Sequence, residues 1–439
     1  MKPLRICLVN SRLEGPYPPL GIGYIASYLR KYGKDKYDIK IVDGNCCRDI
    51  LKEVYKINPE IIGFTALSPQ IKEAVDLSWQ IRKWKKTIFQ VVGGIHVSAM
   101  PEETLSKGAF DIEILREGEE TFCELVDLFS RNKLSKDALE RIKGVCFKDN
   151  GVFYCTPRRE EIADLDMIPP PARDLFDMKH YLSYHLAIRG LTGSRITTVM
   201  GSRGCPFNCT FCSSKIVFKG VRQFSTEYLI AEIKDLIKQY NIKAVFFTDD
   251  TFTINKEKIR NFCTQFINEG LSAKIKWEVQ GRVNLISWQD LELLQLMKKA
   301  GCVQIDYGFE SGSERILDFL KKSTARISDN ERAIQVTKKA GLQVMGTFMV
   351  GTPGETEADL EKTKDFVSKN FNQIGYFQTF VSTPYPGTEL YDICFEKGLV
   401  AKDYFEQLSE EGLKKDGPVV YCDTVPREKV IEVLRYLNN

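Results

Sequence analysis

The sequence predicts an α/β protein with two parallel-sheet domains: a doubly wound sheet followed by an incomplete (β/α) barrel. Two observations support this class. Short apolar segments alternate with amphipathic stretches along most of the chain, and "KKAG" recurs at 298–301 and 338–341, each time just before a predicted strand. With 439 residues the chain has room for roughly two to four domains. The expected segments are 1–142, 143–194, 195–399 and 400–439.

The first segment, 1–142, is predicted to form a doubly wound, Rossmann-like sheet. Its strands are expected at 5–10, 37–44, 60–66 and 89–94, and its helices at about 20–33 and 70–86. Ligands of such sheets bind beyond the carboxyl ends of the strands. The loop with Gly93, Gly94 and His96 is therefore a candidate site, although a glycine pair also marks a simple tight turn.

The second segment, 143–194, is predicted to be a hairpin followed by a connector. Asn150 and Gly151 supply the positive φ angles of a two-residue turn, so residues 144–155 are expected to pair as a hairpin. Residues 156–194 contain three consecutive prolines and no sustained period, which is typical of an inter-domain connector.

The third segment, 195–399, repeats a strand-and-helix unit. Strands are expected at 196–200, 243–250, 275–281, 303–310, 343–351 and 376–382. Six units predict a partial, TIM-like (β/α)6 barrel, and Gly301 and Gly341 are expected to end helices in the left-handed conformation. Functional residues of such barrels follow the strands; here these are Asp249, Asp250, Arg282, Glu310, Ser311 and the loop from Gly351.

Composition excludes several classes of protein. The formal net charge is +3 without a long like-charge block, so a nucleic-acid partner is not implied. No apolar run reaches the ~18–20 residues that a membrane-spanning helix needs, and we expect a cytoplasmic protein. Thirteen scattered cysteines do not resemble a disulfide framework and fit a reducing compartment, where a local cluster indicates metal or redox chemistry.

Cys205, Cys209 and Cys212 form such a cluster in a loop between a predicted strand and a helix. Three thiolates at this spacing can each bind one iron of a cubane cluster and leave the fourth iron open to a ligand. Two alternatives remain open. The first is a structural zinc, which would need a distant fourth ligand such as Cys155, Cys263, His180 or His185. The second is three buried thiols that bind no metal.

The three cysteines, with Phe211 before the last one, resemble the signature of the radical S-adenosylmethionine (SAM) enzymes. The likeness continues through "FFTDDTFTINKEKI", "QGRVNLIS", "YGFESGSERIL", "FMVGTPGET" and "TPYPGTELYD". The first domain, with "PLGIGYIASYLRKYG", "GGIHVSAMPEETL", "EGEETF" and "PPPARDLFD", is similar to the cobalamin-binding domain of one subgroup. The resemblance covers about residues 4–400, and its motifs follow in order.

The resemblance implies a [4Fe-4S] cluster whose open iron chelates SAM. Phe211 would then contact the adenine, Asp249 or Asp250 would receive the methionyl amino group, and Glu310 and Ser311 would sit near the ribose. Gly351 would let backbone approach the adenine. Other readings of these residues stay open, because Asp250 and Thr251 could cap a turn, and Glu310 could be a buried carboxylate paired with Arg282.

The resemblance also implies that the first domain binds cobalamin. A DxHxxG motif is missing, so no histidine is marked as the lower ligand of cobalt. His96 could contact the corrin or its tail, but an ordinary loop histidine is the favoured interpretation.

The implied reaction is methylation of an unactivated carbon of a small-molecule or natural-product substrate, through a 5′-deoxyadenosyl radical and methylcobalamin. An electron donor such as flavodoxin or ferredoxin is the implied partner. A cyclase or rearrangement enzyme with the same cofactors is the first alternative, and a non-catalytic cobalamin or metal sensor is the second. Ten further cysteines form no second cluster of this kind, which counts against methylthiotransferase chemistry.

Overall fold

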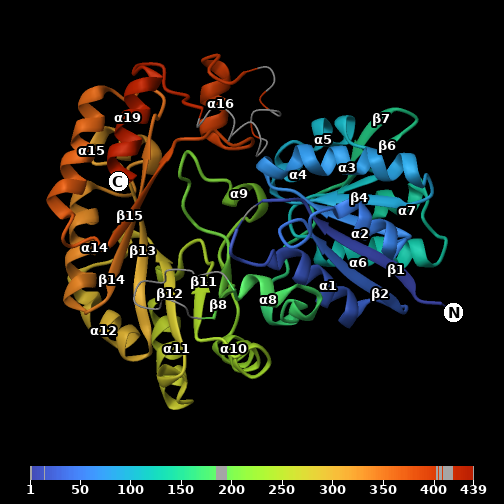
Figure 1. The fold of residues 1–439 in the computed structure, drawn as a ribbon, viewed down its shortest axis with the longest axis horizontal. Coiled ribbons are helices and arrows are strands. Elements are labelled where there is room, and N and C mark those ends of the chain that lie inside the picture. Colours follow the sequence, from blue (N-terminus) through green and yellow to red (C-terminus); the bar gives the residue numbers. More distant parts are fainter. Residues whose placement is uncertain are drawn as a thin grey trace. The chain divides into compact units, whose positions relative to one another are not determined.

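A computed structural model describes residues 2–13, 15–183, 195–401, 404, 408 and 419–438. The chain divides into two compact units (Figure 1). The first is formed mainly by residues 2–181, and the second mainly by 195–401 and 419–438. Of the sequence-predicted residues, His185 lies outside the described residues.

The first unit is built on a seven-stranded sheet in the order β2-β1-β3-β4-β5-β6-β7. The first five strands in that order pair in parallel, and the last two are antiparallel. The strands are β1 (Leu4–Asn10), β2 (Tyr37–Asp43), β3 (Ile61–Thr65), β4 (Phe89–Gly93), β5 (Ile112–Ile114), β6 (Val145–Asp149) and β7 (Val152–Cys155). The predicted doubly wound sheet is confirmed, and its order is that of the flavodoxin-like folds.

Helices cover both faces of this sheet. One face carries α1 (Leu20–Tyr32) and α6 (Glu119–Ser130), which pack against each other. Apolar side chains of α2 (Ile50–Ile57) and α3 (Ile71–Trp84) join those of β1, β3 and β4 in a buried core on the other face. The remaining helices are α4 (Ile95–Ala99), α5 (Pro101–Lys107), α7 (Lys136–Arg141) and α8 (Met178–Tyr181).

Two features of the first sheet differ from the sequence analysis. β5 was not anticipated, because three residues are too few to show a period. The hairpin of β6 and β7 forms about Asn150 (φ 48°) and Gly151 (φ 83°), and it extends the sheet, whereas the sequence analysis grouped it with the connector. Cys146 and Cys155 face each other across this hairpin and form a disulfide that the sequence analysis did not foresee.

The second unit contains a parallel six-stranded sheet in the order β15-β14-β13-β12-β11-β8. Its strands are β8 (Ile196–Val199), β11 (Ala244–Phe247), β12 (Lys276–Gly281), β13 (Cys302–Glu310), β14 (Gln343–Val350) and β15 (Tyr376–Val381). All six fall where the sequence predicted them, and the order without crossing or closure is that of a partial (β/α)6 barrel.

Helices line the outer face of this curved sheet (Figure 1). They are α10 (Thr226–Tyr240), α11 (Lys256–Asn268), α12 (Leu291–Lys299), α14 (Ile327–Lys339) and α15 (Glu357–Asn370). Gly301 (φ 102°) and Gly341 (φ 81°) follow α12 and α14 in the left-handed region, as the repeated "KKAG" predicts. Shorter elements are β9 (Ser202–Arg203), α9 (Ser214–Val217), β10 (Arg222–Gln223), α13 (Glu314–Lys321) and α16 (Glu389–Glu396).

The last helix, α19 (Arg427–Asn438), packs beside the edge strand β15. The Asn438 side chain accepts from the Thr379 N–H at 2.8 Å and donates to the Thr379 carbonyl at 3.0 Å. One amide therefore satisfies both backbone groups of a residue at the open edge of the sheet.

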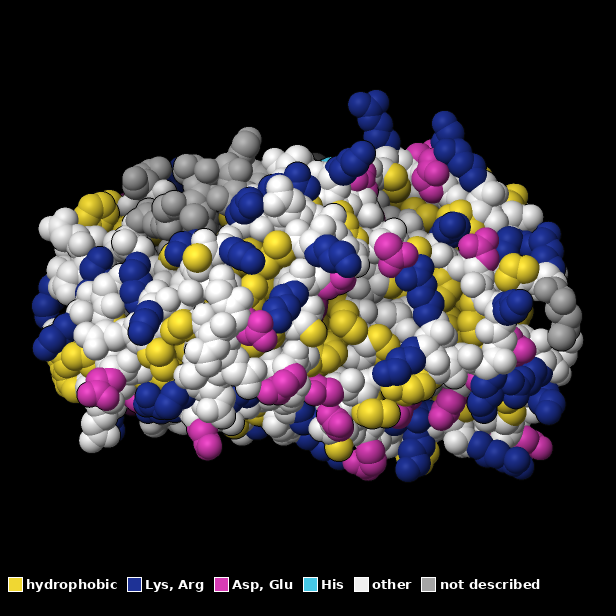
Figure 2. Space-filling view, turned by 90° about the horizontal axis from the view of Figure 1, so that it is seen from below, with side chains coloured by type: hydrophobic (Ala, Val, Ile, Leu, Met, Phe, Trp, Pro, Cys, Tyr) yellow, Lys and Arg dark blue, Asp and Glu magenta, His cyan; other side chains and the backbone are white. Residues whose placement is uncertain are grey.

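No described helix is both long and apolar enough to span a membrane. On the face shown in Figure 2, basic and acidic side chains are interspersed, in keeping with the small net charge.

Candidate functional site

The cysteine loop begins directly after β8 and ends at α9. Cys205 is buried, Cys209 is half-buried and Cys212 is exposed. Backbone hydrogen bonds hold the middle of the loop at Thr210, whose N–H donates to the Leu320 carbonyl at 3.0 Å and whose carbonyl accepts from the Leu390 N–H at 2.9 Å. The loop is thus tied to the end of α13 and the start of α16.

Three thiols on this loop fit the ligand set of a cubane iron–sulfur cluster. Among the described residues no three His, Cys, Asp or Glu side chains are arranged to hold one metal ion. A cubane does not require such convergence, because each thiolate binds a different iron. Of the distant ligands that a zinc site would need, Cys155 is bonded to Cys146 and Cys263 is buried on α11.

A cation lies directly against these thiols. Arg282 follows β12, and its Nη1 donates to the Cys209 Sγ at 3.1 Å, while its Nη2 donates to the Thr324 Oγ1 at 2.5 Å. The guanidinium carbon is 3.8 Å from the centre of the Phe207 ring. This contact stabilises negative charge on the Cys209 sulfur. The sequence analysis raised a pairing of Arg282 with Glu310 as an alternative, and the structure does not show this pairing.

The two aspartates after β11 have different surroundings. Asp249 is buried and accepts from the Gly201 N–H at 2.8 Å and from the Ser202 Oγ at 2.5 Å, so it fixes the start of the cysteine loop. Burial raises the pKa of Asp249 to about 6. Asp250 is exposed and accepts from the Ser214 Oγ at 2.5 Å. Only Asp250 therefore presents its carboxylate outward.

Glu310 ends β13 in the left-handed region (φ 62°) and forms a buried ion pair with Lys321, at 2.6 Å between Oε1 and Nζ. The Lys321 ammonium is 5.6 Å from the centre of the Phe211 ring, so the ion pair and this aromatic ring are neighbours. Ser311 points elsewhere: its Oγ is 3.2 Å from the Thr363 Oγ1 and accepts from the Ser313 N–H at 3.1 Å.

The loop after β14 turns sharply at Gly351 (φ 76°) and Gly354 (φ 74°). Glu355 holds it, because its Oε2 accepts from the Gly351 N–H at 2.6 Å and the Thr352 N–H at 3.1 Å. Burial raises the pKa of Glu355 to about 7. The hydroxyls of Thr352 and Ser382 beside this turn are buried, and neither has a hydrogen-bond partner among the described residues. Such groups suit a polar ligand at the strand ends.

The sequence analysis did not name four residues of this site: Lys321, Thr352, Glu355 and Ser382. Glu355 lies inside the quoted "GTPGET" and was the easiest to find, because an acid after a glycine turn commonly accepts from the turn's backbone. Lys321 carries no local signal, since its partner is eleven positions away and meets it only through the fold.

In the first unit, the glycine pair closes the carboxyl end of β4. Gly94 has φ 116°, and a Cβ there would lie 2.5 Å from the Ala66 carbonyl oxygen, so the position requires glycine. At Gly93 a Cβ would meet only ordinary contacts, 3.4 Å or more away. Local packing therefore does not require glycine at position 93.

His96 lies in the first turn of the short α4 and is buried, with its Nδ1 3.0 Å from the Ser68 Oγ. Burial lowers the pKa of His96 to about 4, so the ring is neutral near pH 7. The same edge of the sheet carries a polar chain that the sequence analysis did not name, in which Gln70 donates to Asn10 at 3.0 Å and Asn10 donates to Asp43 at 2.9 Å. A buried polar edge of this kind fits a large polar cofactor.

Comparison with known proteins identifies the domains in which the two candidate sites lie. Residues 199–367 match the Radical SAM superfamily, and residues 6–126 match the B12 binding domain. An uncharacterized methyltransferase of Pyrococcus horikoshii is 36% identical over 414 residues, which cover 91% of this chain and 85% of that protein.

Two further similarities are more distant. An anaerobic magnesium-protoporphyrin IX monomethyl ester cyclase of Cereibacter sphaeroides is 28% identical over 357 residues, 81% of this chain and 57% of that protein. The structure of the radical SAM methyltransferase TsrM of Kitasatospora setae, with cobalamin and a [4Fe-4S] cluster bound, has the same fold: the TM-score is 0.72 at 17% identity, covering 95% of this chain and 79% of that chain. The chain therefore belongs to the radical SAM enzymes that carry a cobalamin-binding domain, and its cofactors are a [4Fe-4S] cluster, SAM and cobalamin.

Proposed function

We propose that the chain is a cobalamin-dependent radical SAM methyltransferase that adds a methyl group to an unactivated carbon of a small-molecule or natural-product substrate. The observation that carries this proposal is the presence, in one chain, of a three-thiol loop on a partial barrel and a separate sheet of the cobalamin-binding type. When bound, the cluster supplies the electron that cleaves SAM to methionine and a carbon radical, and cobalamin carries the methyl group.

In this proposal the residues around the cysteine loop have distinct tasks. Cys205, Cys209 and Cys212 bind three irons, and Arg282 supports the sulfur of Cys209 from 3.1 Å. Phe211 contacts the adenine, and its closeness to the Lys321 ammonium of the Glu310 pair supports a polar and aromatic surface for the nucleoside.

The remaining SAM contacts are assigned by exposure and turn geometry. Asp250 is better placed than Asp249 to receive the methionyl amino group, because Asp249 is buried against the loop backbone. Gly351 admits backbone close to the adenine. The hydrogen bonds of Ser311 to Thr363 and Ser313 support an indirect role, holding the end of β13 beside the ribose.

On the first unit, Gly93, Gly94 and His96 belong to the proposed cobalamin site. The lowered pKa of His96 and its contact with Ser68 support a neutral ring that offers a hydrogen bond to the corrin or its tail. The proposal includes a low-potential electron donor, such as flavodoxin or ferredoxin, that reduces the cluster. It also includes a cytoplasmic location.

The test uses anaerobically reconstituted protein, cobalamin, reductant and SAM with a deuterated methyl group. We expect the labelled methyl group in the corrinoid fraction and 5′-deoxyadenosine in solution. Cys209→Ala should abolish deoxyadenosine formation, whereas the matched Cys263→Ala, a buried thiol on α11, should retain it. A corrinoid fraction that stays unlabelled while deoxyadenosine accumulates would contradict methyl transfer.

The similarity to the magnesium-protoporphyrin cyclase favours one second candidate, a cobalamin-containing cyclase without methyl transfer. That enzyme would give deoxyadenosine and an unlabelled corrinoid. A non-catalytic cobalamin or metal sensor, the other alternative raised by the sequence, would give neither product.

A further inference from the structure

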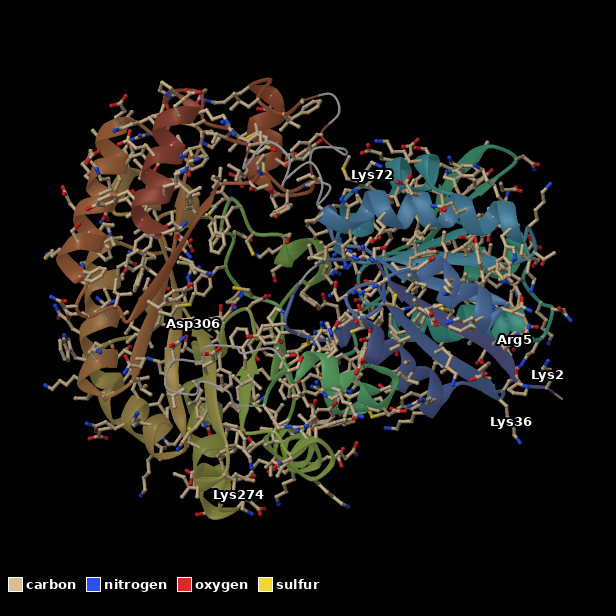
Figure 3. All side chains as sticks on the ribbon, viewed as in Figure 1. Lys2, Arg5, Lys36, Lys72, Lys274 and Asp306 are labelled. Carbon is tan, nitrogen blue, oxygen red and sulfur yellow. A yellow bond between two sulfur atoms is a disulfide. The ribbon has the colours of Figure 1, made fainter. Side chains whose placement is uncertain are left out.

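The inner face of the six-stranded sheet carries a cluster of Glu278, Gln304 and Asp306. Side chains alternate along a strand, and the neighbours of these residues point to the outer helices: Trp277 packs on Phe262 of α11, and the Tyr307 hydroxyl is 2.8 Å from the Thr337 Oγ1 of α14. The three cluster residues therefore face inward, and Figure 3 labels Asp306 on this side of β13.

One amide joins the two acids. The Gln304 Nε2 donates to the Asp306 Oδ1 at 2.7 Å and to the Glu278 Oε2 at 3.2 Å. Glu278 and Gln304 are buried, whereas Asp306 is half-buried and reaches the accessible side of the face. The cluster is thus a set of hydrogen-bond acceptors held in place by Gln304, and Asp306 is its most accessible member.

The described residues supply no positive charge to this cluster. Burial raises the pKa of Glu278 and of Asp306; the second cause for Glu278 is the neighbouring acid itself, and no Lys, Arg or His contributes to either shift. Two buried carboxylates without a cation are electrostatically unfavourable, so the empty cluster favours protonation, and a bound cation would favour the ionised forms instead.

A separate observation indicates a missing donor. The Gln304 side chain is 4% exposed, and its Oε1 has no hydrogen-bond partner among the described residues. A buried carbonyl oxygen in this state requires an N–H or O–H group to reach it. An ammonium group carries three such donors together with the positive charge.

The face of β14 beside the cluster is partly exposed. There the residues that face outward are buried, while Met345, Thr347 and Met349, which alternate with them, are partly exposed. Met345 pairs in register with Asp306. Flexible methionines beside an acceptor cluster suit the apolar portion of a molecule whose polar end is held by Asp306.

We propose that Glu278, Gln304 and Asp306 bind a protonated amine of the substrate. The ammonium group would donate to Asp306 and to the Gln304 Oε1, and the apolar part of the molecule would lie against Met345 and Met349. The substrate class is then a cationic, amine-bearing molecule. Only the identification of this ligand as the substrate rests on the proposed function; the binding site itself does not.

Calorimetric titration of the anaerobically reconstituted holoenzyme tests the site with three probes of equal length: n-hexylammonium chloride, 1-hexanol and sodium hexanoate. Hexylammonium should bind more tightly than hexanol, and hexanoate should bind least. Asp306→Asn should weaken hexylammonium binding by about tenfold or more, because the charged partner of the ammonium group is lost. The same affinity for hexylammonium and hexanol would overturn the proposal.

Two variants separate this site from general effects. Asp365→Asn, at an exposed acid on α15, should bind hexylammonium like the wild type. Glu278→Gln keeps the shape of the cluster and should weaken binding less than Asp306→Asn, because burial keeps the Glu278 carboxyl protonated in the absence of a cation; unchanged binding in Asp306→Asn would exclude the cluster. Deoxyadenosine formation by the wild type is measured in parallel, without added amine. An absence of SAM cleavage would contradict the proposed function. It would not affect the binding result, which tests the cluster separately.

Discussion

Arg282 shows how a single side chain can tune the cysteine loop. Its guanidinium donates to the Cys209 Sγ and lies over the Phe207 ring, so its position is fixed from two sides. Hydrogen bonds and charge next to a cluster sulfur are among the main determinants of a cluster's reduction potential. A cation at this place stabilises the reduced, more negative state.

Arg282→Gln should therefore lower the midpoint potential of the cluster, so that a given reductant reduces a smaller fraction of it. The potential is measured by a redox titration followed by electron paramagnetic resonance. Arg260→Gln, at an exposed arginine on α11, is the control and should leave the potential unchanged. An Arg282→Gln potential equal to that of the wild type would mean that the guanidinium does not act on the cluster.

Glu278 gives a prediction of stability against pH. Burial raises its pKa above the ordinary 4.5, so above this pH the folded state holds a proton that the unfolded state has lost. The stability of the wild type then falls as pH rises, and a neutral isostere removes this loss. Glu278→Gln should match the wild-type melting temperature near pH 4 and exceed it at pH 8.

Thermal unfolding followed by circular dichroism at both pH values checks this expectation. Glu292→Gln, at an exposed acid on α12, should show no difference that depends on pH. A Glu278→Gln protein that is less stable than the wild type at pH 8 would show that the carboxyl group is ionised and satisfied in the folded protein.

At the scale of elements, the hydrogen bonding of the edge strand β15 depends on one residue of α19, Asn438. Thr379 is buried, and its N–H and carbonyl are both bonded by the Asn438 side chain. Asn438→Ala leaves both groups unpaired and should cost about 1–3 kcal/mol of unfolding free energy. Hydrogen exchange of the Thr379 amide should accelerate in the same variant.

Denaturant unfolding and hydrogen exchange by mass spectrometry measure these two effects. The matched control is Arg435→Ala, at an exposed position of the same helix, which should change neither. Unaltered exchange at Thr379 in Asn438→Ala would show that the edge is protected by packing alone.

For the whole molecule, the elements with a strong period were predictable from the sequence, and pairings between distant segments were not. The six barrel strands, the hairpin about Asn150 and the glycine caps follow from apolar periodicity and turn chemistry, which act locally. The short β5, the Cys146–Cys155 disulfide and the Glu310–Lys321 pair depend on which segments the fold brings together. The cluster of Glu278, Gln304 and Asp306 was missed for the same reason, since its residues come from two strands.

The two units each have their own sheet and their own helices, so their cofactor sites should be separable by mutation. The triple variant Cys205→Ala, Cys209→Ala, Cys212→Ala should bind cobalamin with wild-type stoichiometry and show no iron and no SAM cleavage. Gly94→Ala should lose cobalamin and keep iron and SAM cleavage, because its Cβ would clash with the carbonyl of Ala66, the residue that follows β3. Gly93→Ala, where a Cβ fits, is the steric control for this change.

Iron and corrinoid content, deoxyadenosine yield and label transfer to the corrinoid distinguish the variants. We expect Gly94→Ala to retain iron and deoxyadenosine formation while its cobalamin content falls, and Gly93→Ala to fold with wild-type stability whatever its cobalamin content. Loss of the iron–sulfur cluster in Gly94→Ala would show that the two sites are coupled through folding. Because methyl transfer needs both cofactors, the triple variant and Gly94→Ala should each lose label transfer, although each keeps the cofactor chemistry of the other unit.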